Sequence, residues 1–170
     1  MGTLSKSVIL CAVVALGACT NPNSLGQGGG AGAGSGVSAI EPGSASDPTS
    51  PAYFQQTIGD RVLFLVDQST LTDEGRAVLA AQAGWLNTNS DYVAIIEGHA
   101  DEQGTREYNL ALGARRSNAV REYLVSQGVA GSRLKTLSYG KERPIEICSA
   151  EACYSQNRRA VTIISAGLSS

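Results

Sequence analysis

An arginine on the apolar stripe of a predicted helix limits the folds open to this chain. The residues that share this helical face, at steps of three and four, are Asn109, Leu112, Arg116, Val120 and Leu124. A buried guanidinium must meet an anion, because leaving it unpaired is strongly destabilising. The spacing leaves three readings open: an ion pair with Asp101, a packed stem whose head reaches water, or a cleft in which a ligand supplies the carboxylate.

Strand-like and helix-like segments alternate from residue 61 onward. Short apolar runs predict strands at 61–66, 92–98, 134–139 and 160–165, and helical spacing of apolar residues predicts helices at 72–87 and 105–127. We expect Thr72 to cap the first helix, Trp85 to lie in the core and Gly128 to end the second helix. Residues 145–155 show no regular pattern. The order β-α-β-α-β-loop-β predicts a two-layer α/β sandwich, with a mixed sheet and helices on one face.

The first nineteen residues predict an export signal. Lys6 supplies positive charge, residues 8–16 form an apolar core too short to span a bilayer stably, and small residues lead to Cys19. Residues 16–19, Leu-Gly-Ala-Cys, resemble the lipobox of bacterial lipoproteins, which implies a signal peptide over residues 1–18 and lipid on the Cys19 thiol. The alternative is an ordinary secretory signal cut at the same place, with Cys19 left as a free thiol.

Residues 19–51 consist mainly of Gly, Ser, Ala, Asn and Pro and offer almost nothing to bury. This composition is typical of a flexible spacer, with a root-mean-square reach of roughly 30 Å as a coil. Residues 52–170 are then the one globular domain, which is long enough to bury a core of its own. The formal net charge of -2, with no basic patch, argues against a nucleic-acid partner.

The helical stripe belongs to a longer pattern. Together with Gly113 it spells N-x2-L-G-x2-R-x3-V-x3-L, which resembles the signature of OmpA-like peptidoglycan-binding domains. Three further segments, EGHADEQGT at 97–105, SYGKERP at 138–144 and SQNRRAV at 155–161, resemble the lipoproteins of this family in order and spacing. The resemblance covers residues 61–165. It implies the same α/β sandwich and non-covalent capture of the peptide stem of the cell wall.

The resemblance also implies which residues bind the ligand. Asp101 and Arg116 fall on the charged pair of the family, Asn109 and Leu112 shape the pocket beside them, and Phe64 matches the aromatic residue that ends the first strand. Diaminopimelate carries an ammonium and a carboxylate on one carbon. It would suit a carboxylate and a guanidinium that face each other across an open crevice.

The chain differs from the family pattern at Leu65 and matches it at residues 157–159. Family members often have an aspartate where this chain has Leu65, which removes one polar contact. Asp67, two positions on, either compensates or leaves a site with fewer hydrogen bonds. Asn157, Arg158 and Arg159 resemble the NRR of the family; we expect them to serve as capping and surface charge, and a ligand contact is the alternative.

Location and partners follow from the same resemblance. Several acyl chains on Cys19 would hold the domain at a membrane without embedding it, and Thr20 stands where an aspartate is associated with retention in the inner membrane. The expected location is the outer membrane, with the domain lipid-anchored and facing the periplasm. The implied partners are peptidoglycan, TolB and the other Tol proteins that act at cell division. No cofactor and no enzymatic activity are expected.

A metal-dependent envelope hydrolase is the main alternative function. Glu97, His99 and Asp101 alternate along a predicted strand, so their side chains would share one face and could hold a metal ion. His99 is the only histidine in the chain, which leaves the common zinc ligand sets incomplete. The sequence therefore favours a binding protein over a metalloenzyme.

Cys148 and Cys153 lie in one irregular loop of a chain that is expected to be exported, where oxidation is normal. We expect a disulfide between them, with two reduced thiols as the alternative. So small a ring contributes only about 2 kcal/mol in the chain-entropy model. The bond should hold the loop near Asn157 without deciding the fold.

Overall fold

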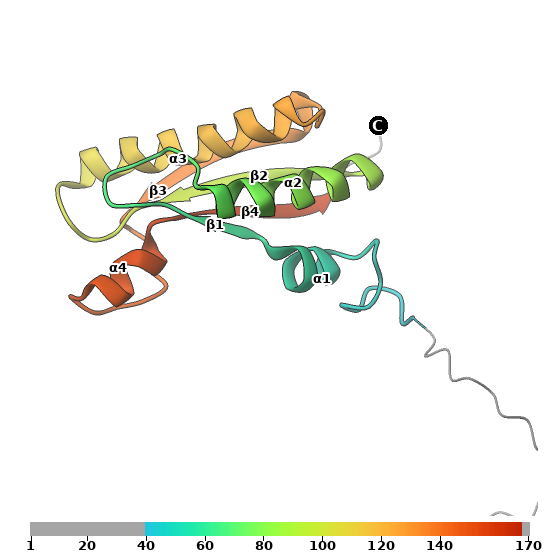
Figure 1. The fold of residues 1–170 in the computed structure, drawn as a ribbon, viewed down its shortest axis with the longest axis horizontal. Coiled ribbons are helices and arrows are strands. Elements are labelled where there is room, and N and C mark those ends of the chain that lie inside the picture. Colours follow the sequence, from blue (N-terminus) through green and yellow to red (C-terminus); the bar gives the residue numbers. More distant parts are fainter. Residues whose placement is uncertain (1–39, 168–170) are drawn as a thin grey trace, which may run out of the picture. The chain divides into compact units, whose positions relative to one another are not determined.

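Alternating apolar segments pair into a four-stranded sheet in the computed structural model, which describes residues 40–167 (Figure 1). The predicted signal peptide and lipidated Cys19 lie outside these residues and stay predictions. The elements in chain order are α1 (Pro51–Tyr53), η1 (Phe54–Gly59), β1 (Arg61–Leu63), α2 (Asp73–Thr88), β2 (Tyr92–His99), α3 (Arg106–Ser126), η2 (Gly131–Arg133), β3 (Leu134–Gly140), α4 (Glu151–Asn157) and β4 (Arg159–Ala166).

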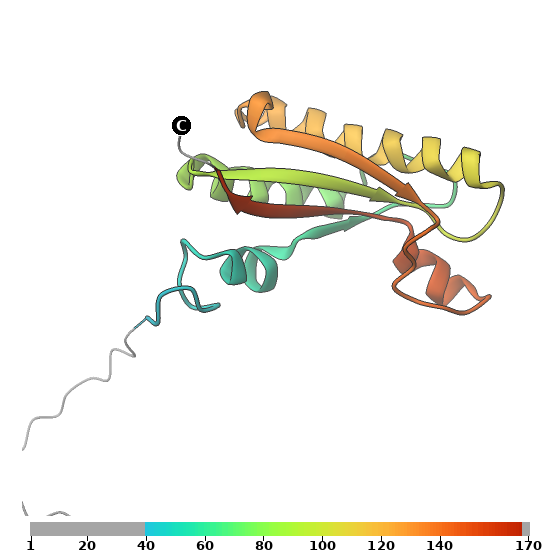
Figure 2. The ribbon, with the colours of Figure 1, turned by 180° about the vertical axis from the view of Figure 1, so that it is seen from behind.

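The sheet is mixed, as the sequence predicts. Its strand order is β1-β4-β2-β3; β2 runs parallel to β3 and antiparallel to β4, and β4 runs antiparallel to β1. Figure 2 shows β3, β2 and β4 side by side from behind. The prediction of an α/β sandwich with a mixed sheet is confirmed. Within residues 40–167, no helix combines the length and apolar character that a bilayer crossing requires.

The two long helices begin and end close to where local signals place them. The Thr72 hydroxyl accepts the Gly75 amide at the start of α2, and Thr105 caps α3 in the same way through Tyr108. Gly128 follows α3 with a φ of 92°, a conformation that glycine adopts without a steric penalty. These caps and stops depend on nearby residues only, which is why the sequence predicts them well.

A close approach between Gly98 and Gly113 positions α3 on the sheet. A Cβ atom on Gly98 would lie 1.8 Å from the Gly113 carbonyl oxygen, so only glycine fits there. The backbones of α3 and β2 therefore touch at this point. As a result, the signature face of α3 lies directly above the carboxyl end of β2.

Pro48 and Thr49 pack on the domain, although the sequence predicts that they belong to the spacer. Trp85 Nε1 donates to the Pro48 carbonyl at 2.7 Å, and the Tyr92 hydroxyl donates to the Thr49 carbonyl at 3.0 Å. Phe54 is fully buried against Trp85, with 5.0 Å between ring centroids, which confirms Trp85 as a core residue. The domain therefore begins before residue 51. The sequence does not predict this boundary, because the contacts are made by backbone carbonyls, which every residue has.

Two predicted elements are wrong in extent or type. The first strand stops at Leu63 instead of residue 66, because the chain turns away to cross α3; Asp67 in this turn has a φ of 60°. The predicted irregular stretch at 145–155 overlaps the short helix α4, which runs from Glu151 to Asn157. Asn157 at its end accepts the amides of Ile145 and Glu146, so contacts with the preceding loop stabilise a helix that has no apolar periodicity.

Candidate functional site

A cavity of about 240 Å³ opens where β2 ends and α3 begins. Asp101, from the loop after β2, and Asn109 and Leu112, from the first turns of α3, all line it, as the sequence predicts. The other residues around it are Val66, Asp67, Gln103, Gly104 and Tyr108. The loop after β1 and the loop after β2 therefore form two sides of one pocket above the signature helix.

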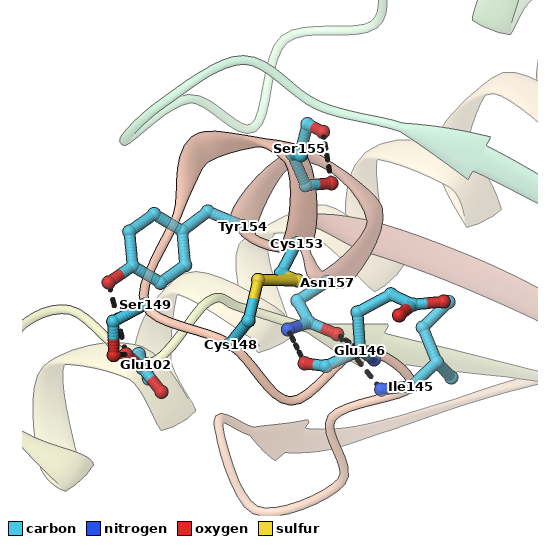
Figure 3. Close-up of a disulfide and its surroundings, with 10 residues drawn as sticks. Glu102, Ile145, Glu146, Cys148, Ser149, Cys153, Tyr154, Ser155 and Asn157 are labelled. Carbon is cyan, nitrogen blue, oxygen red and sulfur yellow. Dashed lines mark hydrogen bonds between the residues drawn. A yellow bond between two sulfur atoms is a disulfide. The ribbon is translucent and has the colours of Figure 1, made fainter.

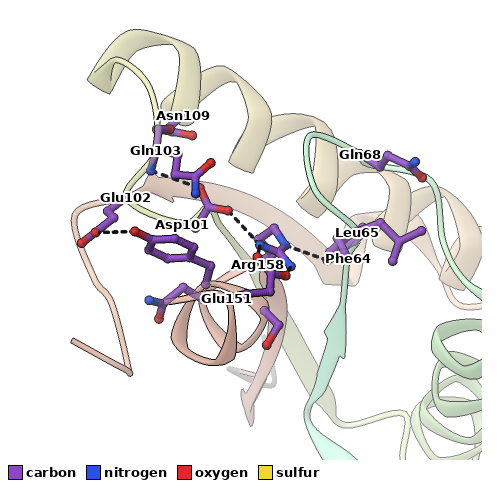
Figure 4. Close-up of polar contacts among 12 residues, drawn as sticks. Phe64, Leu65, Gln68, Asp101, Glu102, Gln103, Asn109, Glu151 and Arg158 are labelled. Carbon is purple, nitrogen blue, oxygen red and sulfur yellow. Dashed lines mark hydrogen bonds and ion pairs between the residues drawn. The ribbon is translucent and has the colours of Figure 1, made fainter. Parts of the chain in front are cut away.

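Asn109 shapes the loop that carries Asp101. Its side-chain Nδ2 donates to the backbone carbonyl of Gln103 at 2.7 Å, and the backbone N–H of Gln103 donates to Asp101 Oδ1 at 3.2 Å (Figure 4). Asn109 is almost fully buried. An asparagine can thus hold the loop by its side chain, and this fixes the position of the Asp101 carboxylate at the cavity.

The charged partner of Asp101 is Arg158. The guanidinium Nη1 of Arg158 lies 3.1 Å from Asp101 Oδ2, while other donors of the same group reach Glu151 and the Phe64 carbonyl (Figure 4). Burial alone would lower the pKa of Arg158, but hydrogen bonds to Glu151 and Asp101 raise it above its ordinary value. The expectation that Arg158 is surface charge is wrong. The NRR pattern could have marked Arg158 as a functional residue, but the spacing of residues along the chain does not show that Asp101 is its partner.

Arg116 was expected to face an open crevice opposite Asp101, but its side chain is buried outside the cavity. It is 0% exposed, and its nitrogens Nε, Nη1 and Nη2 donate to three carbonyl oxygens, at 2.8, 2.8 and 3.1 Å; these belong to Gln68, His99 and Leu65. Burial lowers the pKa of Arg116 to about 10, with the Asp101 carboxylate opposing the shift, so the group stays charged at neutral pH. Arg116 thus ties the loop after β1 to the end of β2 and does not line the cavity.

Phe64 is also placed beside the cavity instead of in it. Its ring lies 5.2 Å from the Arg116 guanidinium carbon and is 2% exposed. It contributes to a second, larger cavity, which Arg158 also lines. Phe64 therefore supports the buried arginine through its ring face.

Asp67 adds a second carboxylate to the first cavity. It accepts a hydrogen bond from the Tyr108 hydroxyl and holds a left-handed backbone conformation with a φ of 60°. Such a conformation is unfavourable for a residue with a side chain and is found where the surroundings impose it. The cavity therefore presents two carboxylates, Asp67 from one loop and Asp101 from the other, a pattern suited to a cationic group.

The metal-binding alternative finds no ligand set in residues 40–167. His99 and Glu97 do share a face, with 3.7 Å between Nε2 and Oε2. The Asp101 carboxylate, however, pairs with Arg158. Across the described part of the chain, no three His, Cys, Asp or Glu side chains are placed to hold a metal ion.

The predicted disulfide joins Cys148 to Cys153 and is confirmed (Figure 3). It closes the loop that leads into α4. Ser149 of this loop and Tyr154 of α4 donate to the Glu102 carboxylate at 3.1 and 3.0 Å. Because Glu102 follows Asp101, the disulfide loop and α4 contact the loop after β2, which forms one side of the site.

Removing both cysteines, as Cys148→Ala with Cys153→Ala, should lower the free energy of unfolding by about 2 kcal/mol. Urea titrations of the oxidised parent and the double variant would measure this. We also expect faster amide exchange at Ile145 and Glu146, because their acceptor Asn157 is no longer held in place. Equal stability and unchanged exchange would mean that the hydrogen bonds alone hold the loop.

Known proteins resemble this chain over most of its length. The sequence pattern of the OmpA family matches residues 63–158. The peptidoglycan-associated lipoprotein of Mesorhizobium japonicum is 51% identical over 161 residues, which cover 93% of this chain and 90% of that protein. The lipoprotein of the same name from Agrobacterium fabrum is 47% identical over 157 residues, with 92% and 85% covered.

Solved structures agree with the fold. The crystal structure of the peptidoglycan-associated lipoprotein from Burkholderia pseudomallei superimposes with a TM-score of 0.63 at 37% identity, covering 70% of this chain and 97% of that one. The C-terminal domain of Helicobacter pylori MotB gives a TM-score of 0.59 at 19% identity, covering 64% and 86%. The second similarity concerns the fold alone.

Proposed function

Because this chain belongs to the OmpA family, and within it to the peptidoglycan-associated lipoproteins, we propose that it binds peptidoglycan non-covalently and tethers the outer membrane to the cell wall. The similar curated proteins are peptidoglycan-associated lipoproteins, which are not enzymes. The observation that carries the proposal is the cavity at the end of β2, in which signature residues of α3 and two carboxylates meet.

The proposed ligand is the diaminopimelate of a stem peptide. Its free ammonium would sit between Asp101 and Asp67, where two carboxylates favour a cation. Its carboxylate would be drawn toward the buried guanidinium of Arg116. Reaching Arg116 requires that the ligand displace a carbonyl of the loop after β1, such as that of Leu65. Binding is therefore proposed to move this loop.

The proposed anchor is lipid on Cys19 in the outer membrane. The residues that follow Cys19 would then link the lipid to the domain. The spacer predicted from the sequence would let a domain held at one layer search for a target in the next. Contact with TolB and the Tol machinery, which would connect wall binding to cell division, is proposed from family membership, without assigned residues.

Sedimentation with purified sacculi tests the proposed site. Asp101→Asn removes the negative charge but keeps the shape, so we expect at least tenfold weaker binding, equal to about 1.4 kcal/mol. Asp91→Asn serves as the matched control, because Asp91 is an exposed carboxylate just before the other end of β2. The mature chain should be used with Cys19→Ser, so that lipid does not carry it into the pellet.

Two outcomes would contradict the proposal. Undiminished sedimentation of a folded Asp101→Asn protein would exclude this carboxylate from the site. Competition by a stem peptide that ends in lysine, as strongly as by one that ends in diaminopimelate, would exclude recognition of both charged groups on one carbon.

A further inference from the structure

The outer edge of β1 is an unpaired strand edge. The Asp60 carbonyl accepts the Thr162 amide and the Phe64 amide donates to the Arg158 carbonyl, so these residues face β4. Backbone groups alternate direction along a strand, and the N–H and C=O of Arg61 and Leu63 therefore face away from the sheet. Within residues 40–167, β1 pairs with β4 alone.

A cavity of about 500 Å³ lies along this edge. Its apolar lining comes from β1 and the residues after it, with one side chain from α2: Val62, Leu63, Phe64, Leu65 and Val78. The beginnings of α2 and α4 flank it, and Figure 1 shows β1 running between these two helices. An apolar hollow thus accompanies a row of outward-facing backbone donors and acceptors.

Apolar side chains stay accessible at this edge. Leu63 is 39% exposed and Leu65 is 56% exposed. Short strands, charge, proline or a covering element usually protect a native strand edge, and β1 is short and carries Arg61. Arg61 is, however, paired with Asp60, and the apolar side chains left open make the edge a template for another strand. Only an extended backbone satisfies both the hydrogen-bonding groups and the hollow, because alternate side chains of an added strand point to one side.

The charges around this cavity favour a cationic segment. The carboxylates there or in direct contact belong to Asp60, Glu74, Asp101 and Glu151, against the two cations Arg61 and Arg158. Both cations are already paired, Arg61 with Asp60 and Arg158 with Asp101 and Glu151. Glu74 makes no ion pair with any residue of the described chain and is exposed at the mouth of the cavity.

We propose that the edge of β1 binds an extended segment of another protein as an added strand, with an apolar side chain in the 500 Å³ cavity and a Lys or Arg beside Glu74. This site is separate from the proposed wall site, since Asp101, Asn109 and Leu112 line the other cavity. One lipoprotein could then hold the wall and a protein partner at the same time.

The test uses the mature chain with Cys19→Ser and the acetylated, amidated heptapeptide KTVFVTK as probe. We expect saturable shifts of the Arg61 and Leu63 amide resonances. A peptide N-methylated at alternate residues on its pairing edge should bind at least tenfold more weakly, and this comparison leaves the protein unchanged. Leu63→Pro should also weaken binding tenfold, since it removes an outward N–H that the sheet does not use.

Charge and independence are tested with matched variants. Glu74→Gln should weaken peptide binding about threefold, whereas Glu107→Gln, a carboxylate in the first turn of α3, should not. Asp67→Asn changes a carboxylate that lines the wall cavity but not the cavity along β1. It should weaken wall binding and leave peptide binding intact, so the two sites can fail separately.

Several results would overturn the proposal. These are no shift at millimolar peptide, equal affinity for the N-methylated peptide, or shifts confined to the Asp101 cavity. Concentration-dependent dimerisation that buries the Arg61 and Leu63 amides would do so as well, because it would identify the occupant as a second copy of this chain.

Discussion

Replacing Arg116 with alanine is expected to lower the free energy of unfolding by about 3–5 kcal/mol. The guanidinium is fully buried and supplies hydrogen bonds to three carbonyls, those of Leu65, Gln68 and His99. Alanine would leave these acceptors without a donor and open a cavity under Phe64. The loop after β1 would lose its attachment to α3, so the wall site should deteriorate together with stability.

Urea unfolding of Arg116→Ala and Arg115→Ala measures this effect against a matched control. Arg115 is the preceding residue on α3 and is exposed, so its removal should change the free energy of unfolding by less than about 0.5 kcal/mol. Arg116→Lys should fall between the two, because an ammonium cannot reach three carbonyls arranged for a planar fork.

The comparison also separates two roles of Arg116. Should Arg116→Ala be as stable as Arg115→Ala yet fail to sediment with sacculi, the guanidinium would act at the ligand and its contacts with the carbonyls would be dispensable. Loss of binding in a destabilised variant would carry no such meaning. Binding must therefore be measured without denaturant, at a temperature at which the variant has the far-ultraviolet circular dichroism spectrum of the native protein.

The departure from the family pattern at Leu65 has a physical explanation. The Leu65 contact with Arg116 runs through its carbonyl oxygen, and its side chain is 56% exposed. A backbone contact does not depend on the side chain, so the loop can hold Arg116 with leucine in place of aspartate. Asp67 then supplies the carboxylate at the cavity. This arrangement fits the first of the two readings left open by the sequence.

Local signals predicted most of the fold. Helix starts at Thr72 and Thr105 and the stop at Gly128 depend on residues within one turn, and the strands depend on short apolar runs. The family resemblance implied that Asp101, Asn109 and Leu112 share one pocket, and the structure places all three around one cavity, where a strand end and the next helix start are close along the chain.

Long-range pairing was not predictable in the same way. Arg158 lies 57 residues after Asp101, and nothing in the spacing selects it over Arg116 as the partner. Backbone acceptors are equally hidden, because every residue carries a carbonyl whatever its type. The sequence predicts a carboxylate or water as the partner of Arg116, whereas three converging carbonyl oxygens satisfy its guanidinium instead.

Lowering the pH from 7 to 4 is expected to remove up to about 3 kcal/mol of stability through His99 alone. The ring is 2% exposed, and neither of its nitrogens has a hydrogen-bond partner in the described chain. Burial, followed by the charges of Arg159 and Arg143, lowers the pKa of His99 to about 4 from an ordinary value of 6.5. The Glu97 carboxylate Oε2 lies 3.7 Å from Nε2.

The direction follows from proton uptake. The unfolded chain binds a proton at His99 below pH 6.5, while the folded chain does so only near pH 4. The stabilisation by the neutral ring is thus complete above pH 6.5 and is lost as the pH falls through this window. His99 is the only histidine of the chain, so no other imidazole contributes between these values.

His99→Phe provides the control for this titration. Phenylalanine keeps a ring that can stack on Tyr139, whose centroid lies 5.6 Å away, and it cannot be protonated. Urea midpoints measured at half-unit steps from pH 7 to 4.5 should fall for the parent and stay nearly level for the variant. Parallel curves for the two proteins would place the acid sensitivity in groups other than His99. In that case the buried imidazole would have to be ionised in the folded state, with Glu97 as the group that stabilises it.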